Sequence, residues 1–209
     1  MRSFRRIFLD YYLHKHSKLI NGNVFDIGGE KFNKRGKFNL NKFNVNCIYV
    51  NNNPDTKPDI IADISKINLS SNVADTLVVT ETLEYVNDIN LALKELKRIS
   101  KKNGYLLISI PLLNSIHGDK DKDSARYTES FLYSIFKRYN FKIINFYRMG
   151  GLGSVIFDLI RSHLVLRKRK IFLRLLYIFY YFFVLVDMLT KFSREYINTG
   201  YFVVLQNNE

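Results

Sequence analysis

The sequence has a single cysteine, Cys47, among its 209 residues. One thiol excludes a disulfide framework and, without a second cysteine, a CxxC motif or a thiolate zinc site. This cysteine usage is typical of a cytoplasmic protein. The four histidines show no spacing that indicates a metal site.

A secretion signal and a single membrane-spanning run are also missing. Arg2, Arg5 and Arg6 resemble the start of a signal peptide, but Asp10 and the polar residues 14–16 interrupt any apolar core behind them. The apolar stretch 171–186 would measure ~24 Å as a helix, short of the ~30 Å hydrocarbon core. We expect it to lie in the head-group plane of a membrane; the alternatives are a buried helix of the domain or a dimer interface.

Acidic residues are scarce, since 19 acids face 32 bases and leave a net charge of +13. Nucleic acid, anionic lipid and an acidic substrate are the partners that such an excess suits. Residues 1–20, 30–42 and 161–174 carry net charges of +4, +4 and +6, so the rest of the chain is close to neutral. The excess of base therefore belongs to three blocks rather than to the whole chain.

The first block predicts an N-terminal amphipathic helix within residues 1–20. Its apolar face is expected to hold Phe4, Ile7, Phe8, Tyr11, Tyr12 and Leu19. The arginines and lysines of the block are expected elsewhere on the surface. Such a helix either packs on the domain alone or also touches a membrane.

Apolar residues make up 47% of the sequence, which excludes a disordered chain, and the length fits a single domain over residues 1–209. Short apolar runs alternate with helical patterns, as in an open parallel sheet with helices on its faces. Strands are expected at 24–27, 47–50, 60–62, 76–80 and 105–110.

Two helices accompany these strands. Asn87 or Asp88 can cap the first, whose apolar residues recur at helical spacing up to residue 99, and Gly104 is expected to end it. Thr128 is expected to cap the second. Ligands of such sheets bind at the carboxyl ends of the strands, so the site is expected there.

Distinct motifs end the strands. VFDIGGEKF follows the first strand with an acid and two glycines, which allow the backbone to turn sharply and approach a ligand closely. YVNNNP, PDIIADIS, ADTLVVTETLEYV, GYLLISIP and HGDKDKDSARYT follow in order. In this order and spacing, over about residues 20–150 and the closing TGYFVVL, the sequence resembles the class I S-adenosylmethionine-dependent methyltransferases. Among them it is most similar to small bacterial enzymes often encoded with surface-polysaccharide biosynthesis genes.

The resemblance implies an α/β fold with a Rossmann-like, seven-stranded, mostly parallel sheet whose last strand is antiparallel. FKIINFYRMG and GYFVVLQ would be strands six and seven, a hairpin at the sheet edge. A helical insertion over residues 151–197 separates them. Because it leaves from the carboxyl end of strand six, it is expected to roof or flank the acceptor pocket.

The resemblance also implies S-adenosylmethionine as cofactor. Eight residues would contact it: Asp26, Gly28, Gly29, Asn53, Asp63, Ile64, Thr80 and Glu81. The first three would lie beneath the methionine half, Asn53 at the ribose hydroxyls, Asp63 and Ile64 near the adenine, and the last two at the end of the fourth strand. Purely structural alternatives remain: Asp63 can end a strand, Glu81 can cap a turn, and residues 51–53 can form an ordinary turn.

Three departures from the family pattern bear on cofactor binding. Glu30 and Phe32 stand where further glycines are common, and a carboxylate at Glu30 can pair with the ammonium or sulfonium of the cofactor but repels its carboxylate. Asn53 replaces the usual acid at the ribose, so only neutral hydrogen bonds remain. Residues 29–46 show no helical period, which predicts that the usual helix after the glycine turn is missing, together with its dipole.

Methyl transfer is an in-line displacement that depends on positioning and on exclusion of water. If the acceptor is a sugar hydroxyl, a base must take its proton, and histidine suits this task near neutral pH. His117, just past the fifth strand, is the expected general base, with Asp119 or Asp123 orienting it and with Arg126 and Tyr127 lining the acceptor pocket. The alternative for this segment is a solvated surface loop.

Two functions therefore stay open. One is a methyltransferase, cytoplasmic and peripheral at the inner face of the membrane, which modifies a sugar hydroxyl of a lipid-linked or surface glycan. The other is a catalytically degenerate relative that acts as a binding or scaffolding subunit, as Glu30 and Asn53 suggest. A homodimer through the helical insertion is a further option. Nucleic acid is a less suitable partner, because no recognisable binding module accompanies the bases.

Overall fold

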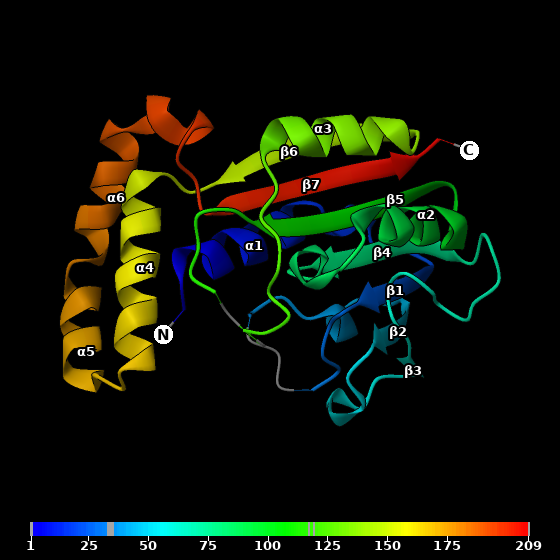
Figure 1. The fold of residues 1–209 in the computed structure, drawn as a ribbon, viewed down its shortest axis with the longest axis horizontal. Coiled ribbons are helices and arrows are strands. Elements are labelled where there is room, and N and C mark those ends of the chain that lie inside the picture. Colours follow the sequence, from blue (N-terminus) through cyan, green and yellow to red (C-terminus); the bar gives the residue numbers. More distant parts are fainter. Residues whose placement is uncertain (1, 33–35, 117, 119, 209) are drawn as a thin grey trace.

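A seven-stranded sheet forms the centre of the computed structural model, which describes residues 2–32, 36–116, 118 and 120–208. The strands are β1 (Asn23–Ile27), β2 (Asn46–Asn51), β3 (Ile60–Ile61), β4 (Ala74–Thr80), β5 (Ser100–Pro111), β6 (Phe141–Met149) and β7 (Gly200–Asn207). Their order is β3-β2-β1-β4-β5-β7-β6, with β1 to β5 parallel and β7 antiparallel to both of its neighbours (Figure 1). This Rossmann-like α/β fold and its hairpin at the edge confirm the sequence prediction.

Helices cover both faces of the sheet. They are α1 (Phe4–Lys15), α2 (Ile89–Ile99), α3 (Glu129–Arg138), α4 (Leu152–Leu166), α5 (Lys170–Ile178) and α6 (Tyr180–Leu189). Short 3-10 helices are η1 (Ser17–Leu19), η2 (Leu40–Lys42), η3 (Pro54–Thr56), η4 (Leu83–Tyr85) and η5 (Lys191–Glu195). In Figure 1, α2 and α3 lie in front of the sheet, α1 lies behind it, and α4 to α6 stand at the end where β1, β4 and β5 terminate.

Each face of the sheet has its own core, because successive side chains of a strand point to opposite faces. In β4, Leu77 and Val79 join the cluster that contains the apolar face of α2, whereas Val78 between them packs with Leu9 and Leu13 of α1. All five side chains are buried. The central strands are therefore apolar on both faces, which is why they read as continuous hydrophobic runs.

Helix starts follow the predicted caps, but one helix end differs. The side chains of Asp88 and Thr128 accept hydrogen bonds from the backbones of their own first turns. The first helix ends at Ile99 rather than at Gly104, because Ser100 already begins β5. Gly104 lies within that strand, where a Cβ would stand 2.9 Å from the carbonyl oxygen of Lys101. The glycine serves close backbone packing and does not end the helix.

The N-terminal helix also differs from the prediction in which face it buries. Leu9 and Leu13 are buried together with Phe4, whereas Tyr11 is 57% exposed. Arg5, expected on the surface, points inward, and only 11% of its side chain is accessible. The contacts of α1 with the sheet on one side and α4 on the other select this face, which the apolar spacing alone did not reveal.

Between β1 and β2 the described residues contain no α-helix, only η2, as the missing helical period predicted. The basic loop that replaces the helix is tied to α1. Asp10 is buried, and its carboxylate accepts hydrogen bonds from the backbone N–H groups of Lys37 (2.9 Å) and Phe38 (3.3 Å). It also pairs with Arg2 at 2.5 Å.

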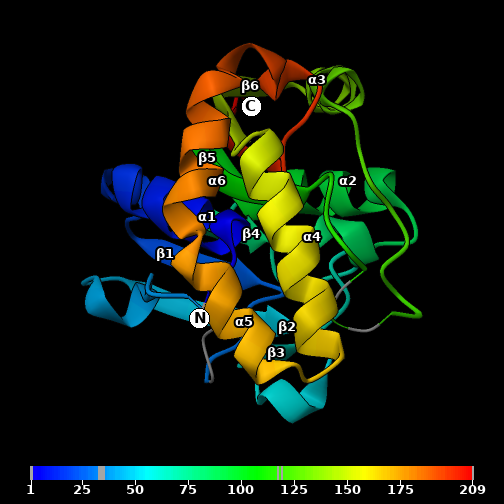
Figure 2. The ribbon, with the colours of Figure 1, turned by 90° about the vertical axis from the view of Figure 1, so that its left-hand side faces the viewer.

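The insertion between β6 and β7 forms α4, α5, α6 and η5. The single helix expected over residues 171–186 is instead two helices, α5 and α6, which are bent by 50° relative to each other. Among the described residues no single helix has the length and apolarity to cross a membrane, while this bent pair meets both criteria when it is taken together. Figure 2 shows α5 and α6 in front, with α4 beside them and the sheet behind.

Candidate functional site

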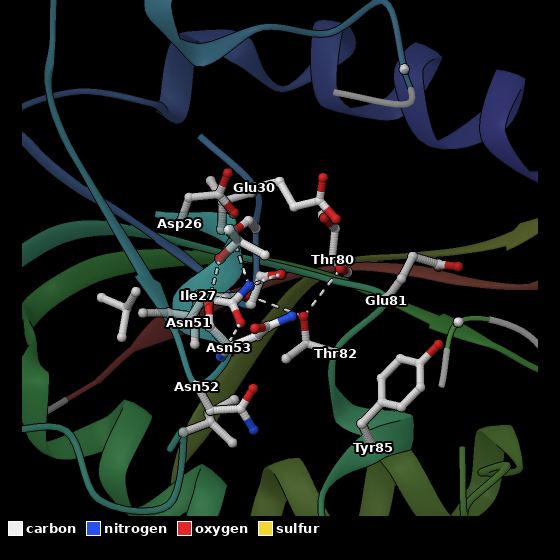
Figure 3. Close-up of a pocket in the computed structure, with 18 of the residues that line it drawn as sticks. Asp26, Ile27, Glu30, Asn51, Asn52, Asn53, Thr80, Glu81, Thr82 and Tyr85 are labelled. Carbon is white, nitrogen blue, oxygen red and sulfur yellow. Dashed lines mark hydrogen bonds between the residues drawn. The ribbon is translucent and has the colours of Figure 1, made fainter. Parts of the chain in front are cut away.

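A pocket of about 410 Å³ opens at the carboxyl ends of β1, β2 and β4. This volume lies within the ~300–1,000 Å³ that is usual for small-molecule sites. All eight residues predicted to contact a cofactor line it: Asp26, Gly28, Gly29, Asn53, Asp63, Ile64, Thr80 and Glu81. The pocket lies at the carboxyl ends of the strands, where a site was expected, and Figure 3 shows several of these side chains around the cavity. Their contact with a cofactor stays a prediction.

The glycine turn after β1 requires glycine at one position. Gly28 has φ +78°, a conformation that residues with a Cβ rarely adopt. A Cβ there would lie 2.4 Å from Oγ1 of Thr82. Thr82 cannot easily move away, because its hydroxyl donates to the carbonyl oxygens of Ile27 and Thr80, both at 3.1 Å. The turn therefore joins the end of β1 to the end of β4 at the bottom of the pocket.

The asparagine run after β2 stabilises this turn. Asn51 donates from its side-chain amide to the carbonyl oxygens of Gly28 and Gly29, both at 3.1 Å. Asn53 accepts from the backbone N–H of Asp55 and so caps η3. Asn53 thus lines the pocket and also stabilises a local turn, which was the structural alternative for this residue. Asn51, which the sequence prediction omitted, is the residue in contact with the glycine turn.

Asp63 and Ile64 lie on the wall after β3. Asp63 accepts hydrogen bonds from the backbone N–H (2.8 Å) and hydroxyl (2.5 Å) of Ser65, so its carboxylate shapes the turn that it begins. Ile64 is 8% exposed and packs with the core cluster. An apolar side chain beside an acidic turn is compatible with a flat aromatic ligand, but both residues also serve the local fold.

Glu81 is a carboxylate of the pocket that is held by several contacts. It follows β4 with φ +56°, and its backbone N–H donates to both the carbonyl and the hydroxyl oxygen of Ser109. The Ser109 hydroxyl donates in turn to Oε1 of Glu81 at 2.9 Å. A non-glycine residue in this conformation stores local strain, which is commonly found at functional sites. A role of Glu81 at the cofactor stays a prediction, beside its structural role in the turn after β4.

Arg5 of α1 forms an ion pair with Glu81, and both side chains are nearly inaccessible. Burial lowers the pKa of the Arg5 guanidinium to about 10, against the opposing effect of nearby carboxylates, chiefly Glu84. The group therefore stays charged at neutral pH. The sequence prediction missed Arg5, because helical periodicity cannot show that the start of α1 lies beside the pocket and brings an arginine to it.

The described lining contains more acids than bases. Its ionisable side chains, apart from Tyr85, are Asp10, Asp26, Glu30, Asp63, Glu81, Arg5, Arg6 and Lys122. In a chain with net charge +13, five carboxylates and three basic groups among the described lining residues are a local exception. Such a lining favours a ligand with net positive charge.

The predicted acceptor residues lie outside the pocket lining. Asp123 and Arg126 form an ion pair with each other, and Tyr127 stacks on Phe131 with 5.2 Å between ring centroids. These contacts fix the segment that leads to α3. His117 and Asp119 lie outside the described residues, so the expected general base stays a prediction. Tyr85, on η4, lines the pocket near Glu81 and was not predicted (Figure 3).

Comparison with known proteins agrees with this geometry. A family model for a methyltransferase domain matches residues 41–108, which contain β2 to β4, α2 and most of β5. No curated protein sequence matches the chain significantly.

Several solved structures share the fold. A SAM-dependent methyltransferase from Archaeoglobus fulgidus is 12% identical, with 96% of this chain and 94% of that chain covered and a TM-score of 0.61. Phosphoethanolamine N-methyltransferase 2 from Haemonchus contortus, solved with S-adenosyl-L-methionine, is 12% identical, with 96% of this chain and 52% of that chain covered and a TM-score of 0.61. The present chain therefore spans about half of the length of that protein. A Burkholderia thailandensis 1,6-didemethyltoxoflavin-N1-methyltransferase, solved with S-adenosylhomocysteine, is 10% identical (98% and 79% covered; TM-score 0.60). The acceptors in these names differ, so the fold alone does not determine the acceptor.

Proposed function

We propose that this chain, which has the fold of the class I S-adenosylmethionine-dependent methyltransferases, transfers a methyl group from that cofactor to an acceptor hydroxyl. The observation that carries the proposal is the carboxylate-rich pocket at the carboxyl ends of β1, β2 and β4. S-adenosylmethionine bears a sulfonium and an ammonium against one carboxylate, so its net charge is positive and suits this lining. When bound, it supplies an electrophilic methyl group that an acceptor oxygen can attack.

The residues of the pocket fit this group. Gly28 permits the tight turn against Thr82 that a Cβ would block, and Asp26 stands beside it, 8% exposed, at the end of β1. Glu30, which a cofactor carboxylate would meet with repulsion, is accompanied in the lining by the cations Arg5 and Arg6. These cations can offset the repulsion between Glu30 and a cofactor carboxylate.

For the acceptor we propose a sugar hydroxyl of a lipid-linked or surface glycan. The lining also carries the hydroxyl of Tyr85 beside the carboxylate of Glu81 (Figure 3), and both groups are suited to hydrogen bonding with a polyol. The proton of the attacking hydroxyl would pass to His117, oriented by Asp119, if these residues have the roles expected from the sequence.

Calorimetric titration with S-adenosylmethionine tests the cofactor. We expect saturable heat from the wild-type chain and a loss of affinity in Asp26→Asn, which removes one carboxylate with little change in shape. Absence of heat at millimolar cofactor would overturn the proposal. A methyl-labelled cofactor, incubated with candidate glycans, then tests the acceptor by transfer of the label.

The second candidate, a catalytically degenerate binding or scaffolding subunit, is motivated by Glu30 and Asn53. The same titration discriminates between the two. If the wild-type chain is silent and the double substitution Glu30→Gly/Asn53→Asp does not restore binding, the degenerate function is favoured. If the substitutions convert a weak binder into a tight one, the site has kept its cofactor function.

A further inference from the structure

The outer face of α5 and α6 is an exposed apolar stripe. Its members recur at alternating steps of four and three residues and are each at least 46% exposed: Ile171, Leu175, Ile178, Phe182, Leu185 and Leu189. This spacing places them along one side of the two consecutive helices. Contiguous apolar surfaces larger than a few hundred Å² are rare on monomers and mark interaction sites.

The opposite face of the same helices is fixed against α4. Leu176 and Phe183 join Phe157 in a small core. Asp187, which is 5% exposed, accepts hydrogen bonds from the hydroxyl (2.5 Å) and the backbone N–H (3.0 Å) of Ser154. The helices therefore cannot turn to bury the outer stripe. A helix pair that is apolar on both faces needs a second apolar surface.

Basic residues border this stripe. Six of them are exposed: Arg167, Lys168, Arg169, Lys170, Arg174 and Lys191. The one acid between residues 161 and 194 is Asp187, which is buried against α4. A shallow groove at the turn from α4 to α5 is lined by His163, Leu164, Arg167, Arg169 and Phe172. Cationic and apolar groups side by side suit a phosphate head group and the start of its acyl chain.

We propose that this docking surface, the six apolar residues of the stripe with the six exposed bases, lies in the head-group plane of an anionic lipid bilayer. The charge selects lipid over a second copy of the chain, because a symmetric pair would bring two such basic surfaces together without acids between them. The bend of 50° and the attachment to α4 favour a pair of helices lying on the bilayer over a span. In Figure 2 this face points toward the viewer.

The docking surface is joined to the pocket through α1. Asp158 of α4 accepts hydrogen bonds from the first N–H groups of α1, on Phe4 (2.8 Å) and Arg5 (2.9 Å). The hydroxyl of Tyr177 on α5 donates to the carbonyl oxygen of Arg2 at 2.5 Å. Arg5 then reaches Glu81 inside the pocket. The proposed surface and the pocket therefore belong to one packed unit, which keeps the pocket close to the bilayer.

Co-sedimentation of the full chain with vesicles tests the proposal and needs no cofactor, so its outcome is separate from that of the proposed function. We expect binding to vesicles of phosphatidylcholine with phosphatidylglycerol and little binding to phosphatidylcholine alone. Reversal of the four bases 167–170 to Glu should lower the partition coefficient on the order of 100-fold or more, since each base near an anionic surface contributes about fivefold. Phe182→Glu, in the apolar stripe, should lower it by about tenfold or more.

A matched quadruple reversal controls for net charge. Lys102, Lys137, Arg138 and Lys142 are exposed at the opposite end of the sheet, and their reversal to Glu should leave binding within about twofold of the wild type after correction for bulk charge. Leu91→Glu, 51% exposed on α2, is the matched control for Phe182→Glu. Equal losses in the paired variants, or equal binding to both kinds of vesicle, would overturn the proposal.

Light scattering supplies the remaining discrimination. We expect a monomer without lipid at micromolar concentration. A dimer that Phe182→Glu dissociates and Leu91→Glu does not would assign the docking surface to a second copy of the chain, and would overturn the lipid assignment.

Discussion

Replacement of Gly28 by alanine tests the glycine turn, because the structure allows its cost to be worked out. The left-handed φ of +78° costs a residue with a Cβ about 1–2 kcal/mol. The new Cβ would stand 2.4 Å from Oγ1 of Thr82, and displacing that hydroxyl loses one or two hydrogen bonds of about 0.5–1.5 kcal/mol each. Reduced freedom of the unfolded chain offsets about 0.4–1 kcal/mol. The net loss in the free energy of unfolding is about 0.5–4.5 kcal/mol.

Gly22→Ala is the matched control for this prediction. Gly22 has a similar φ of +64°, but its Cβ would meet the carboxylate of Asp75, outside the pocket lining. The new Cβ would stand 2.4 Å from Oδ2 of Asp75, which accepts hydrogen bonds from the backbone N–H of Asn23 and from Lys101, so the expected loss is similar to that of Gly28→Ala. Urea unfolding followed by circular dichroism measures both losses, and calorimetric titration measures affinity for S-adenosylmethionine. Gly28→Ala should weaken binding by at least about tenfold, and Gly22→Ala should leave it unchanged. Equal affinity in the two variants would refute the assigned role of the turn.

The remaining predictions concern packing, pH and the buried ion pair. Phe157→Ala empties the centre of the core between α1 and α4 to α6, where this ring is fully buried, and should lower the free energy of unfolding by about 3–5 kcal/mol in urea titrations. The hydrogen bond from Lys101 lowers the pKa of Asp75 in the folded chain. The ionised Asp75 therefore adds to the free energy of unfolding above pH about 4, and this stabilisation is lost as the pH falls further. The difference in stability between neutral and acid pH should be smaller in Asp75→Asn. Arg5→Met removes the cation beside the buried Glu81 carboxylate and should lower the free energy of unfolding by about 3–5 kcal/mol. The double variant Arg5→Met/Glu81→Gln should recover part of this loss. If the losses of the two single variants simply add in the double-mutant cycle, the two residues are not coupled.

Local patterns in the sequence predicted the central strands and the starts of two helices, whereas the resemblance to methyltransferases supplied the layout of the sheet. Val78 and its neighbours form an apolar run that can only be buried on both faces, and Asp88 and Thr128 cap helices through hydrogen bonds within the first turn. The resemblance named eight expected cofactor residues at strand ends, and the common direction of the parallel strands brings them to one pocket. These features depend on interactions between residues near in sequence, or on the shared polarity of parallel strands.

Elements whose partners are distant in sequence were predicted less well. The helix expected to end at Gly104 ends at Ile99, because pairing between β5 and β4 begins at Ser100. The apolar stretch 171–186 has no proline or glycine to mark the break between α5 and α6, which lies at Phe179 beside the core formed with α4. No local signal could have located either boundary.

What the sequence determined by itself was a class of fold, a set of strand ends and three basic blocks. Only the tertiary structure decided which charges face the ligand. Arg5 lies next to Arg6 in a block that reads as surface, yet Asp158 holds the start of α1 beside the pocket, and Arg5 therefore reaches Glu81. The physical reason is that desolvation and pairing depend on residues more than 70 positions apart, whereas periodicity reports only on neighbours along the chain.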